Sequence, residues 1–230
     1  MVAASFSEPT LATTLVDRVR AEIVSGALRP GEKLRLEHLA TRYDVGKSPL
    51  REACCRLASE GLVVIEDQRG FRVAPISRRD LLDLTRTRQQ IEALALRDSF
   101  AHGGLDWEAQ VTGALHKLER TPLRTAEGPD TLSPAWESAH RALHDALVAA
   151  CTSTWLHRFR SVLYDQSERY RRLSVAYERD GRRDILGEHA ALARAALARD
   201  VERTCALMTE HFARTTDLVL EAYPSLDTER

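Results

Sequence analysis

The sequence predicts a mainly α-helical fold in two parts: three short helices with a β-hairpin, and then a bundle of about six longer helices. Two observations support this prediction. Apolar residues recur at three- and four-residue spacing along most of the 230-residue chain, as they do on the buried side of a helix. Residues 62–73 differ, because β-branched and alternating residues flank a turn there, which is typical of paired strands.

The composition is that of a globular protein, with 43% hydrophobic and 29% charged residues. A net charge of −1 excludes a surface covered with basic residues, so contact with nucleic acid would need a local patch. No apolar run is long enough to span a bilayer, and residues 1–8 lack the basic and apolar parts of a signal peptide. We therefore expect a cytoplasmic protein that does not contact membranes.

The first part of the chain predicts a winged helix-turn-helix. Its helices are expected at residues 11–26, 36–43 and 48–60, and its strands at 62–66 and 71–73. Pro75 interrupts the second strand. We accordingly predict one domain at residues 1–75 and a second at residues 76–230.

A turn before the third helix delivers cationic side chains to the first helical turn. Lys47, Ser48 and Arg51 lie there, after Gly46. A recognition helix presents its N-terminal residues to base edges and phosphates, and Lys and Arg can donate to guanine or to phosphate. These three residues are the best candidates for DNA contacts; the alternative is that they are ordinary solvated charges.

This first part resembles the DNA-binding domain of the GntR family over about residues 10–75. The resemblance rests on Leu28-x-Pro30-Gly31-Glu32, on Lys47-Ser48-Pro49-Leu50-Arg51-Glu52-Ala53 and on Gly70-Phe71-x-Val73. It implies the same three DNA contacts and adds Arg35, before the second helix. Gly46 departs from the family, which usually has Ser there, and so removes a hydroxyl that could bind phosphate.

The predicted wing turn offers further contacts to DNA. Arg69 and Arg72 flank Gly70 and could reach the DNA backbone or the minor groove. Either arginine could equally be an ordinary solvated charge.

From residue 77 onward the periodicity is helical. A polar loop is expected at residues 121–133, where Pro and Gly cluster. The predicted helices span residues 78–102, 105–120, 134–151, 153–177, 180–198 and 200–222. The four cysteines show no Cys-x-x-Cys spacing, so we expect buried small side chains and no disulfide or thiolate zinc site.

Four histidines on three of these helices form a candidate metal site. His140 and His144 are four residues apart and project from one face of a helix, while His189 and His211 lie on two later helices. If the helices are antiparallel neighbours, the four imidazoles can converge on a divalent metal. The alternative is that they are surface or satisfied core histidines.

The second part resembles the ligand-binding (FCD) domain of FadR-type GntR regulators. The matching residues are Arg88-x-x-Ile91-Glu92, His144, Glu188-His189 and His211. The resemblance implies a metal held by His144, His189 and His211, with His140 where Asp is typical. Imidazole suits zinc, which we expect most, and also nickel.

A bound metal beside an arginine would attract a carboxylate, and Arg88 lies on a helix suited to clamp its other end. The run from Gln166 to Leu173 offers Tyr170 and Arg171 as further donors, or is a solvated face with one aromatic anchor. Trp136, the histidines and this run resemble the CsiR-type carbon-starvation regulators. That resemblance implies a short dicarboxylate effector such as glutarate.

The sequence therefore favours a ligand-responsive transcriptional regulator and not an enzyme. A homodimer would bind a palindromic operator on double-stranded DNA, and a small carboxylate would release this repressor. Two alternatives remain open: a regulator whose metal is itself the signal, and a metal-dependent enzyme with an accessory DNA-binding domain. Four histidines leave fewer open positions than the three-ligand sites of catalytic zinc.

Overall fold

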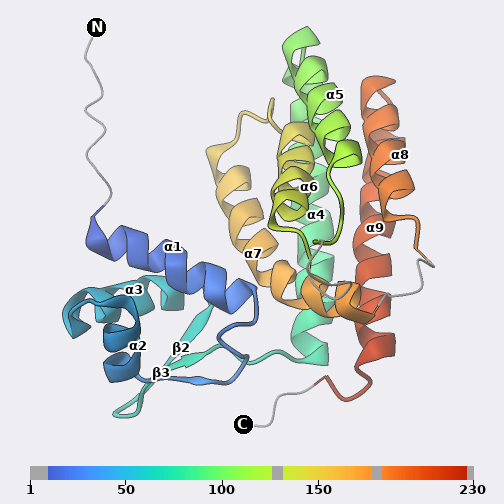
Figure 1. Ribbon diagram of the computed structural model, residues 1–230. Coiled ribbons are helices and arrows are strands. Elements are labelled where there is room, and N and C mark those ends of the chain that lie inside the picture. Colours follow the sequence, from blue (N-terminus) through green and yellow to red (C-terminus); the bar gives the residue numbers. More distant parts are fainter. Residues whose placement is uncertain (1–9, 126–131, 178–182, 227–230) are drawn as a thin grey trace, which may run out of the picture. The chain divides into compact units, whose positions relative to one another are not determined.

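The computed structural model describes residues 10–125, 132–177 and 183–226 of the chain (Figure 1). Residues 1–8, which we predicted not to be a signal peptide, and the middle of the loop predicted at 121–133 lie outside these ranges. The described chain divides into two compact units. One runs to Ser77 and includes Leu226, and the other runs from Arg78 to Ser225.

The N-terminal unit is a winged helix-turn-helix. Its strands form an antiparallel sheet in the order β1-β3-β2, with Leu34 and Ile65 both opposite Phe71. In chain order its elements are α1 (Leu11–Val24), β1 (Lys33–Leu34), α2 (Leu36–Tyr43), α3 (Lys47–Ser59), β2 (Val63–Glu66) and β3 (Gly70–Val73). The prediction of this fold from the sequence is confirmed.

The apolar face of α1 organises the core of this unit. Leu15, Val19 and Ile23 lie one helical turn apart and are buried together with Leu50 and Leu57 of α3. The wing between β2 and β3 needs a glycine at residue 70, whose φ of 96° is costly for any residue with a Cβ.

The C-terminal unit is built from six helices in its described residues, with one isolated antiparallel bridge between Arg124 and Leu132. Its helix α4 packs against α7 and α9, while α5 packs against α6 and α8, and α8 packs against α9 (Figure 1). The helices are α4 (Arg78–His102), α5 (Leu105–Arg120), α6 (Pro134–Leu147), α7 (Thr154–Tyr177), α8 (Ile185–Leu197) and α9 (Val201–Ala222). None of the helices in the described ranges combines the length and apolarity that crossing a membrane requires.

Two helix boundaries and one cysteine differ from prediction. The helix predicted to reach residue 151 ends at Leu147, because Val148 leaves the helical region with φ −115° and ψ 11°. The helix predicted at residues 180–198 begins at Ile185 in the described chain, where the Asp184 side chain caps the N–H of Gly187. Residues 180–182 lie outside the described ranges. Cys55 was expected to be buried but lies on the exposed side of α3.

A buried ion pair fixes α4 against α7 close to the core. Arg160 donates from Nε and Nη2 to the two carboxylate oxygens of Glu92, both at 2.9 Å, and both side chains are almost fully buried. A third bond, from Nη2 of Arg160 to the carbonyl of His144 at 3.1 Å, ties α6 to the same point. Removing either side chain of the pair would leave the other charge buried and unpaired, which is strongly destabilising. The contact therefore holds α4, α6 and α7 together at this point.

Candidate DNA-reading surface and metal centre

The turn between α2 and α3 ends one helix and starts the next. Asp44 adopts the left-handed conformation (φ 54°) and its N–H bonds the carbonyls of Ala40 and Thr41, which closes α2. Gly46 is the N-cap of α3 and offers no capping side chain. A Cβ on Gly46 would meet only Pro49 Cδ at 3.7 Å, so the position has room for the hydroxyl that serine would supply.

Lys47, Ser48 and Arg51 are all exposed at the start of α3. Lys47 Nζ donates to Glu37 Oε1 at 2.8 Å, but both side chains face solvent, so the ion pair contributes little to the stability of the fold. The guanidinium of Arg51 lies 6.0 Å from the centre of the Phe71 ring and has no carboxylate partner within the described chain. The arginine side chain is therefore available to an external acceptor.

The arginines that make up the other predicted DNA contacts differ in whether they already form ion pairs or hydrogen bonds within the protein. Arg35 and Arg69 are exposed and have no ion-pair partner among the residues described. Arg72 donates to Glu66 at 2.8 Å and to the carbonyl of Gly31, which braces β3 against the loop before β1. Arg72 would have to give up these bonds to reach DNA, so its bracing role competes with the predicted contact.

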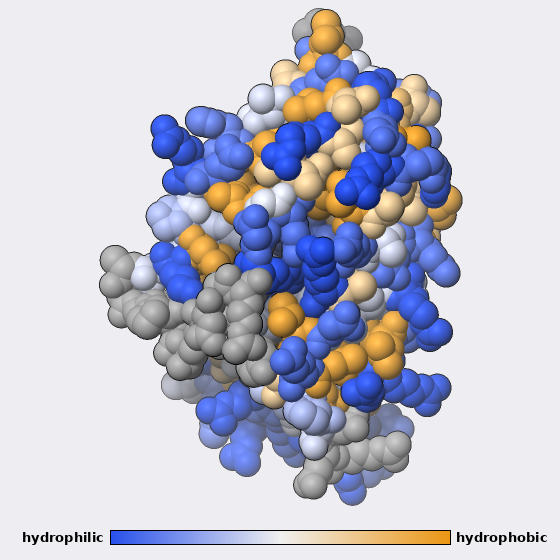
Figure 2. All heavy atoms as spheres, turned by 90° about the vertical axis from the view of Figure 1, so that its right-hand side faces the viewer, coloured by the Kyte–Doolittle hydropathy of each residue, from blue (hydrophilic) through white to orange (hydrophobic). Residues whose placement is uncertain are grey.

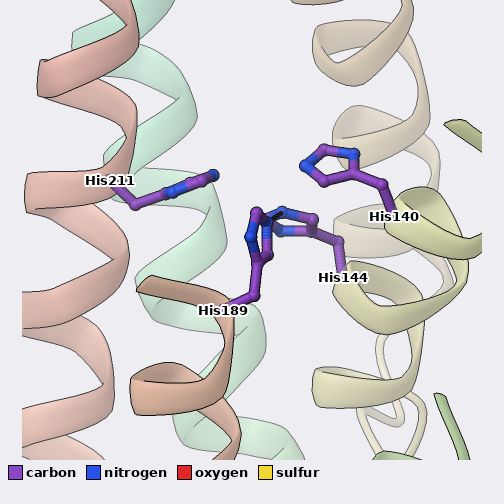
Figure 3. A group of neighbouring side chains, drawn as sticks. All are labelled: His140, His144, His189 and His211. Atoms are coloured by element: carbon purple, nitrogen blue, oxygen red, sulfur yellow. Dashed lines mark hydrogen bonds between the residues drawn. The ribbon is translucent and has the colours of Figure 1, made fainter. Parts of the chain in front are cut away.

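Four imidazoles converge in the middle of the C-terminal unit. His140 and His144 project from α6, His189 from α8 and His211 from α9, and all four rings point towards one another (Figure 3). One nitrogen from each ring lies within 4.8 Å of the others, and all four side chains are buried. The structure thus brings together the four residues predicted from the sequence.

Hydrogen bonds at the outer ring nitrogens set the protonation of two histidines. His189 Nδ1–H donates to the carbonyl of Ile185 at 2.7 Å. His211 Nδ1 lies 2.7 Å from Glu188 Oε2 and 3.1 Å from Arg183 Nη2. The contact with the carboxylate is the shorter of the two, and it is favourable only with a proton on Nδ1. Both rings therefore keep the lone pair on Nε2, the nitrogen turned to the cluster.

The remaining two histidines have weaker partners. His140 stacks on Trp136, with ring centres 4.9 Å apart, and its Nδ1 lies 3.4 Å from the Tyr164 hydroxyl. His144 Nε2 lies 3.3 Å from His189 Nε2, while its Nδ1 has no hydrogen-bond partner within the described residues. A buried nitrogen without a hydrogen-bond partner is costly, so His144 is the least satisfied of the four imidazoles among the described residues.

Burial keeps the four imidazoles neutral. Loss of hydration lowers the pKa of each histidine below its ordinary value, to about 3 for His189. The neighbouring imidazoles and the guanidiniums of Arg88, Arg171 and Arg183 act in the same direction. Neutral imidazole is the form that binds metals.

The donor set fits a divalent transition metal. Zinc bonds imidazole nitrogen at about 2.0–2.1 Å, which places two ligand nitrogens of a tetrahedron roughly 3.3 Å apart. The separation of His144 Nε2 and His189 Nε2 is 3.3 Å. The widest separation in the cluster, 4.8 Å, would have to shrink, so side-chain rotation would complete the coordination.

A small cavity adjoins the histidine cluster, and two arginines are among the residues that line it. Its volume is about 30 Å³, roughly the room for one water molecule. Arg88 donates to Ser167 Oγ at 2.7 Å and stacks on Phe212 at 3.9 Å, but no carboxylate of the described chain pairs with it. The cavity is lined by Leu81, Thr85, Arg88, His140, Ser167, Arg171, His211, Phe212, Thr215 and Thr216.

The predicted effector residues lie in different places. Arg88 and Arg171 line the cavity, and Arg171 binds Glu168 and Glu137 while its Nη1 has no hydrogen-bond partner among the described groups. Tyr170 is also buried, but its hydroxyl donates to Asp80 at 2.7 Å and it is not among the residues that line the cavity. Tyr170 and Arg171 are consecutive residues of α7, so their side chains point in different directions and contact different neighbours.

Sequence reasoning missed several residues that shape the site. The sequence indicated Glu188 and Glu92 only as parts of motifs, and it indicated no role for Tyr164 or Ser167. Helical phase offered one usable signal: Ser167 and Arg171 are four residues apart on α7, and both line the cavity.

Comparisons with known proteins agree with this architecture. The profile described as "Bacterial regulatory proteins, gntR family" matches residues 11–73, and the profile of the FCD domain matches residues 83–214. The chain is 43% identical to the "Uncharacterized HTH-type transcriptional regulator BphR" of Paraburkholderia xenovorans, over 88% of this chain and 82% of that protein. It is 34% identical to the "HTH-type transcriptional repressor GlaR" of Escherichia coli, over 89% and 93% of the two chains.

Two solved structures share the fold. Escherichia coli McbR/YncC superposes with a TM-score of 0.73 at 19% identity, covering 93% of this chain and 99% of that one. A putative GntR regulator from Rhodococcus sp. RHA1 gives 0.70 at 21% identity, covering 92% and 98%. At these identities the likeness extends to the fold alone.

The buried histidines predict an acid-sensitive metal-free protein. In the unfolded chain their pKa returns to about 6.5, so below that pH the unfolded state binds more protons and stability falls. We expect the free energy of unfolding to decrease from about pH 7.5 to about pH 5, by at most about 2 kcal/mol per buried histidine. Urea unfolding of the chelator-treated protein at each pH measures this loss.

His116 provides a control for that measurement, because its side chain is exposed on α5. His116→Gln should leave the pH dependence unchanged, whereas His189→Gln should reduce it. A stability that stays flat over this pH range would contradict the burial of neutral imidazoles.

Proposed function

Because the chain belongs to the GntR family of bacterial regulatory proteins and carries an FCD domain, we propose that it is a repressor released from its operator by a small carboxylate. At the level of the family it is a ligand-responsive, DNA-binding transcriptional regulator and not an enzyme. The observation that carries the finer proposal is the cavity where His140 and His211 share a wall with Arg88 and Arg171.

DNA would be read by the first turn of α3. Arg51 is exposed and has no ion-pair partner among the residues that the structure describes. Lys47 would give up only a weak surface pair with Glu37, so both can turn to base edges or phosphate. Ser48 is exposed beside them, and Arg35, Arg69 and Gly70 would add backbone or minor-groove contacts. Arg72 joins this set only if its bonds to Glu66 and Gly31 open.

The effector is proposed to bind where positive charge lacks a partner. Burial lowers the pKa of Arg88, which means that its charge is costly in the absence of an anion. A metal on the histidines would add further positive charge to the same cavity. A dicarboxylate such as glutarate could place one carboxylate at the metal and the other at Arg88 and Arg171. An arginine can hold a carboxylate with two parallel hydrogen bonds.

The small size of the cavity supports a switch. A volume of about 30 Å³ cannot hold a five-carbon dicarboxylate, so binding has to open the space between α4, α7 and α9. A ligand that fits only the opened form shifts the population towards it. The effector would thereby couple its own binding to a rearrangement of the helical unit.

Zinc is the metal we propose first, and nickel second. The four ligands are neutral nitrogens, which suit these ions better than manganese or calcium. A regulator that senses the metal itself is the alternative. It would respond to zinc alone, whereas the proposed mechanism requires the carboxylate for release.

A homodimer would place two α3 helices on a palindromic operator. The proposal is supported by an apolar stripe on α7, formed by Trp155, Phe159 and Val162, which are 61%, 50% and 41% exposed. The stripe exposes roughly 300 Å² of apolar surface, a core for the roughly 800 Å² that each partner buries in a stable interface. A two-fold axis through the stripe would pack α7 against its own copy.

Removing the arginine of the recognition helix should abolish selective DNA binding. Arg51→Ala is expected to weaken binding about 10- to 100-fold at operator sites selected from random DNA by the wild-type protein. Fluorescence anisotropy at fixed salt measures the affinity, and circular dichroism verifies the fold. Arg56→Ala is the control; unchanged selective binding by Arg51→Ala would refute the assignment.

The effector proposal predicts a thermal shift for the zinc-loaded protein. At a concentration about 100-fold above its Kd, glutarate should add about 2.7 kcal/mol of stability, a rise of roughly 5–10 °C in Tm. Butyrate should give a smaller shift, and Arg88→Gln should remove most of the glutarate response. Arg86→Gln changes an exposed arginine on the same helix and should keep it; equal shifts for Arg88→Gln and Arg86→Gln would exclude Arg88 from the site.

Disrupting the α7 stripe should produce monomers. Trp155→Ser combined with Phe159→Ser is expected to lower the sedimentation coefficient from that of a dimer to that of a monomer. Leu105→Ser, which changes a leucine that is 82% exposed on α5, should leave the dimer intact. A double variant that still sediments as a dimer would move the interface elsewhere.

A further inference from the structure

Glu188 lies behind the histidine cluster and does not belong to it. It precedes His189 on α8, but its carboxylate turns towards α9, where Oε2 accepts the proton of His211 Nδ1 at 2.7 Å. The side chain is only 10% exposed. Figure 2 shows the face of the molecule on the α8 and α9 side, where hydrophilic side chains occupy the middle of the surface.

Two arginines fix the position of this carboxylate. Arg183 donates from Nε to Oε1 at 2.8 Å and from Nη2 to Oε2 at 2.6 Å, a bidentate pair. Arg214 of α9 donates to Oε1 at 3.0 Å. Three hydrogen bonds from two cationic side chains thus hold the carboxylate in a fixed orientation.

Arg183 also anchors the helix that carries His211. It donates to the carbonyl of His211 at 3.1 Å and to Thr215 Oγ1 at 2.9 Å. The carboxylate, the arginine and the imidazole thus form one network that joins the start of α8 to α9. Rotation of the His211 ring would break its bond to Glu188 in this network.

We propose that Glu188 is a positioning residue that holds His211 in the Nδ1–H tautomer and aims its Nε2 lone pair at the cluster. A neutral imidazole carries one proton on either nitrogen, and a carboxylate at Nδ1 keeps the proton there. The same bond increases the basicity of Nε2 and offsets part of the charge of a bound cation. The expected effect of Glu188 on metal affinity rests on the proposed function, whereas the tautomer of His211 does not depend on a metal.

The first experiment needs no metal. Nitrogen-15 NMR of histidine in the metal-free protein distinguishes the Nδ1–H from the Nε2–H tautomer. Wild-type His211 should be protonated at Nδ1, and Glu188→Ala should release that preference. Glu210→Gln is a matched control, because Glu210 also binds Arg214 but is exposed and touches none of the four histidines. A His211 tautomer unchanged in Glu188→Ala would overturn the inference.

The second experiment measures zinc affinity by competition with a chelator. Loss of such an outer carboxylate typically costs 10- to 100-fold in metal affinity, so we expect about that loss for Glu188→Gln and none for Glu210→Gln. Equal affinities for wild type and Glu188→Gln would overturn the inference. Failure of the wild type to bind zinc would instead refute the metal in the proposed function, and the tautomer measurement would still decide the role of Glu188.

Discussion

The cost of removing charge from water governs the C-terminal unit. The unit buries four imidazoles and several guanidiniums in one helical core, and each group avoids that cost differently. The histidines stay neutral, Arg160 pairs with Glu92, and Arg171 pairs with Glu168 and Glu137. Within the described part of the chain, Arg88 donates to the hydroxyl of Ser167 and stacks on two aromatic rings, and no carboxylate forms an ion pair with it. The proposal of an anionic effector rests on this positive charge beside the cluster.

The two units hold their functional side chains in opposite ways. On α3 the side chains are exposed and weakly paired, as Lys47 with Glu37 illustrates, so they can adapt to a partner at little cost. In the helical unit the histidines are buried and two of them are held by hydrogen bonds of 2.7 Å, His189 to the carbonyl of Ile185 and His211 to Glu188. Adaptable contacts suit a surface that docks and leaves, whereas fixed ones suit a site that must hold its geometry.

The sequence predicted what depends on helical period and on turn chemistry. The four-residue spacing of His140 and His144 required only that they share a helix, and the wing followed from Gly70. What depends on tertiary packing was not predictable. The partners of Tyr170 and Arg72 come from residues distant in sequence or across a sheet, so their hydroxyl and guanidinium could not be assigned. The end of α6 was also misplaced, since apolar residues continue past it into the turn.

The enclosure of the histidine cluster sets a time scale for any ion held there. Each of the four residues exposes at most 7% of its surface, so an ion would escape when α6, α8 or α9 separates locally. Its residence time is then governed by the rate of helix opening and not by the supply of free metal. If the proposed function holds, an ion of this kind would stay bound for longer than the effector and would act as a lasting part of the protein.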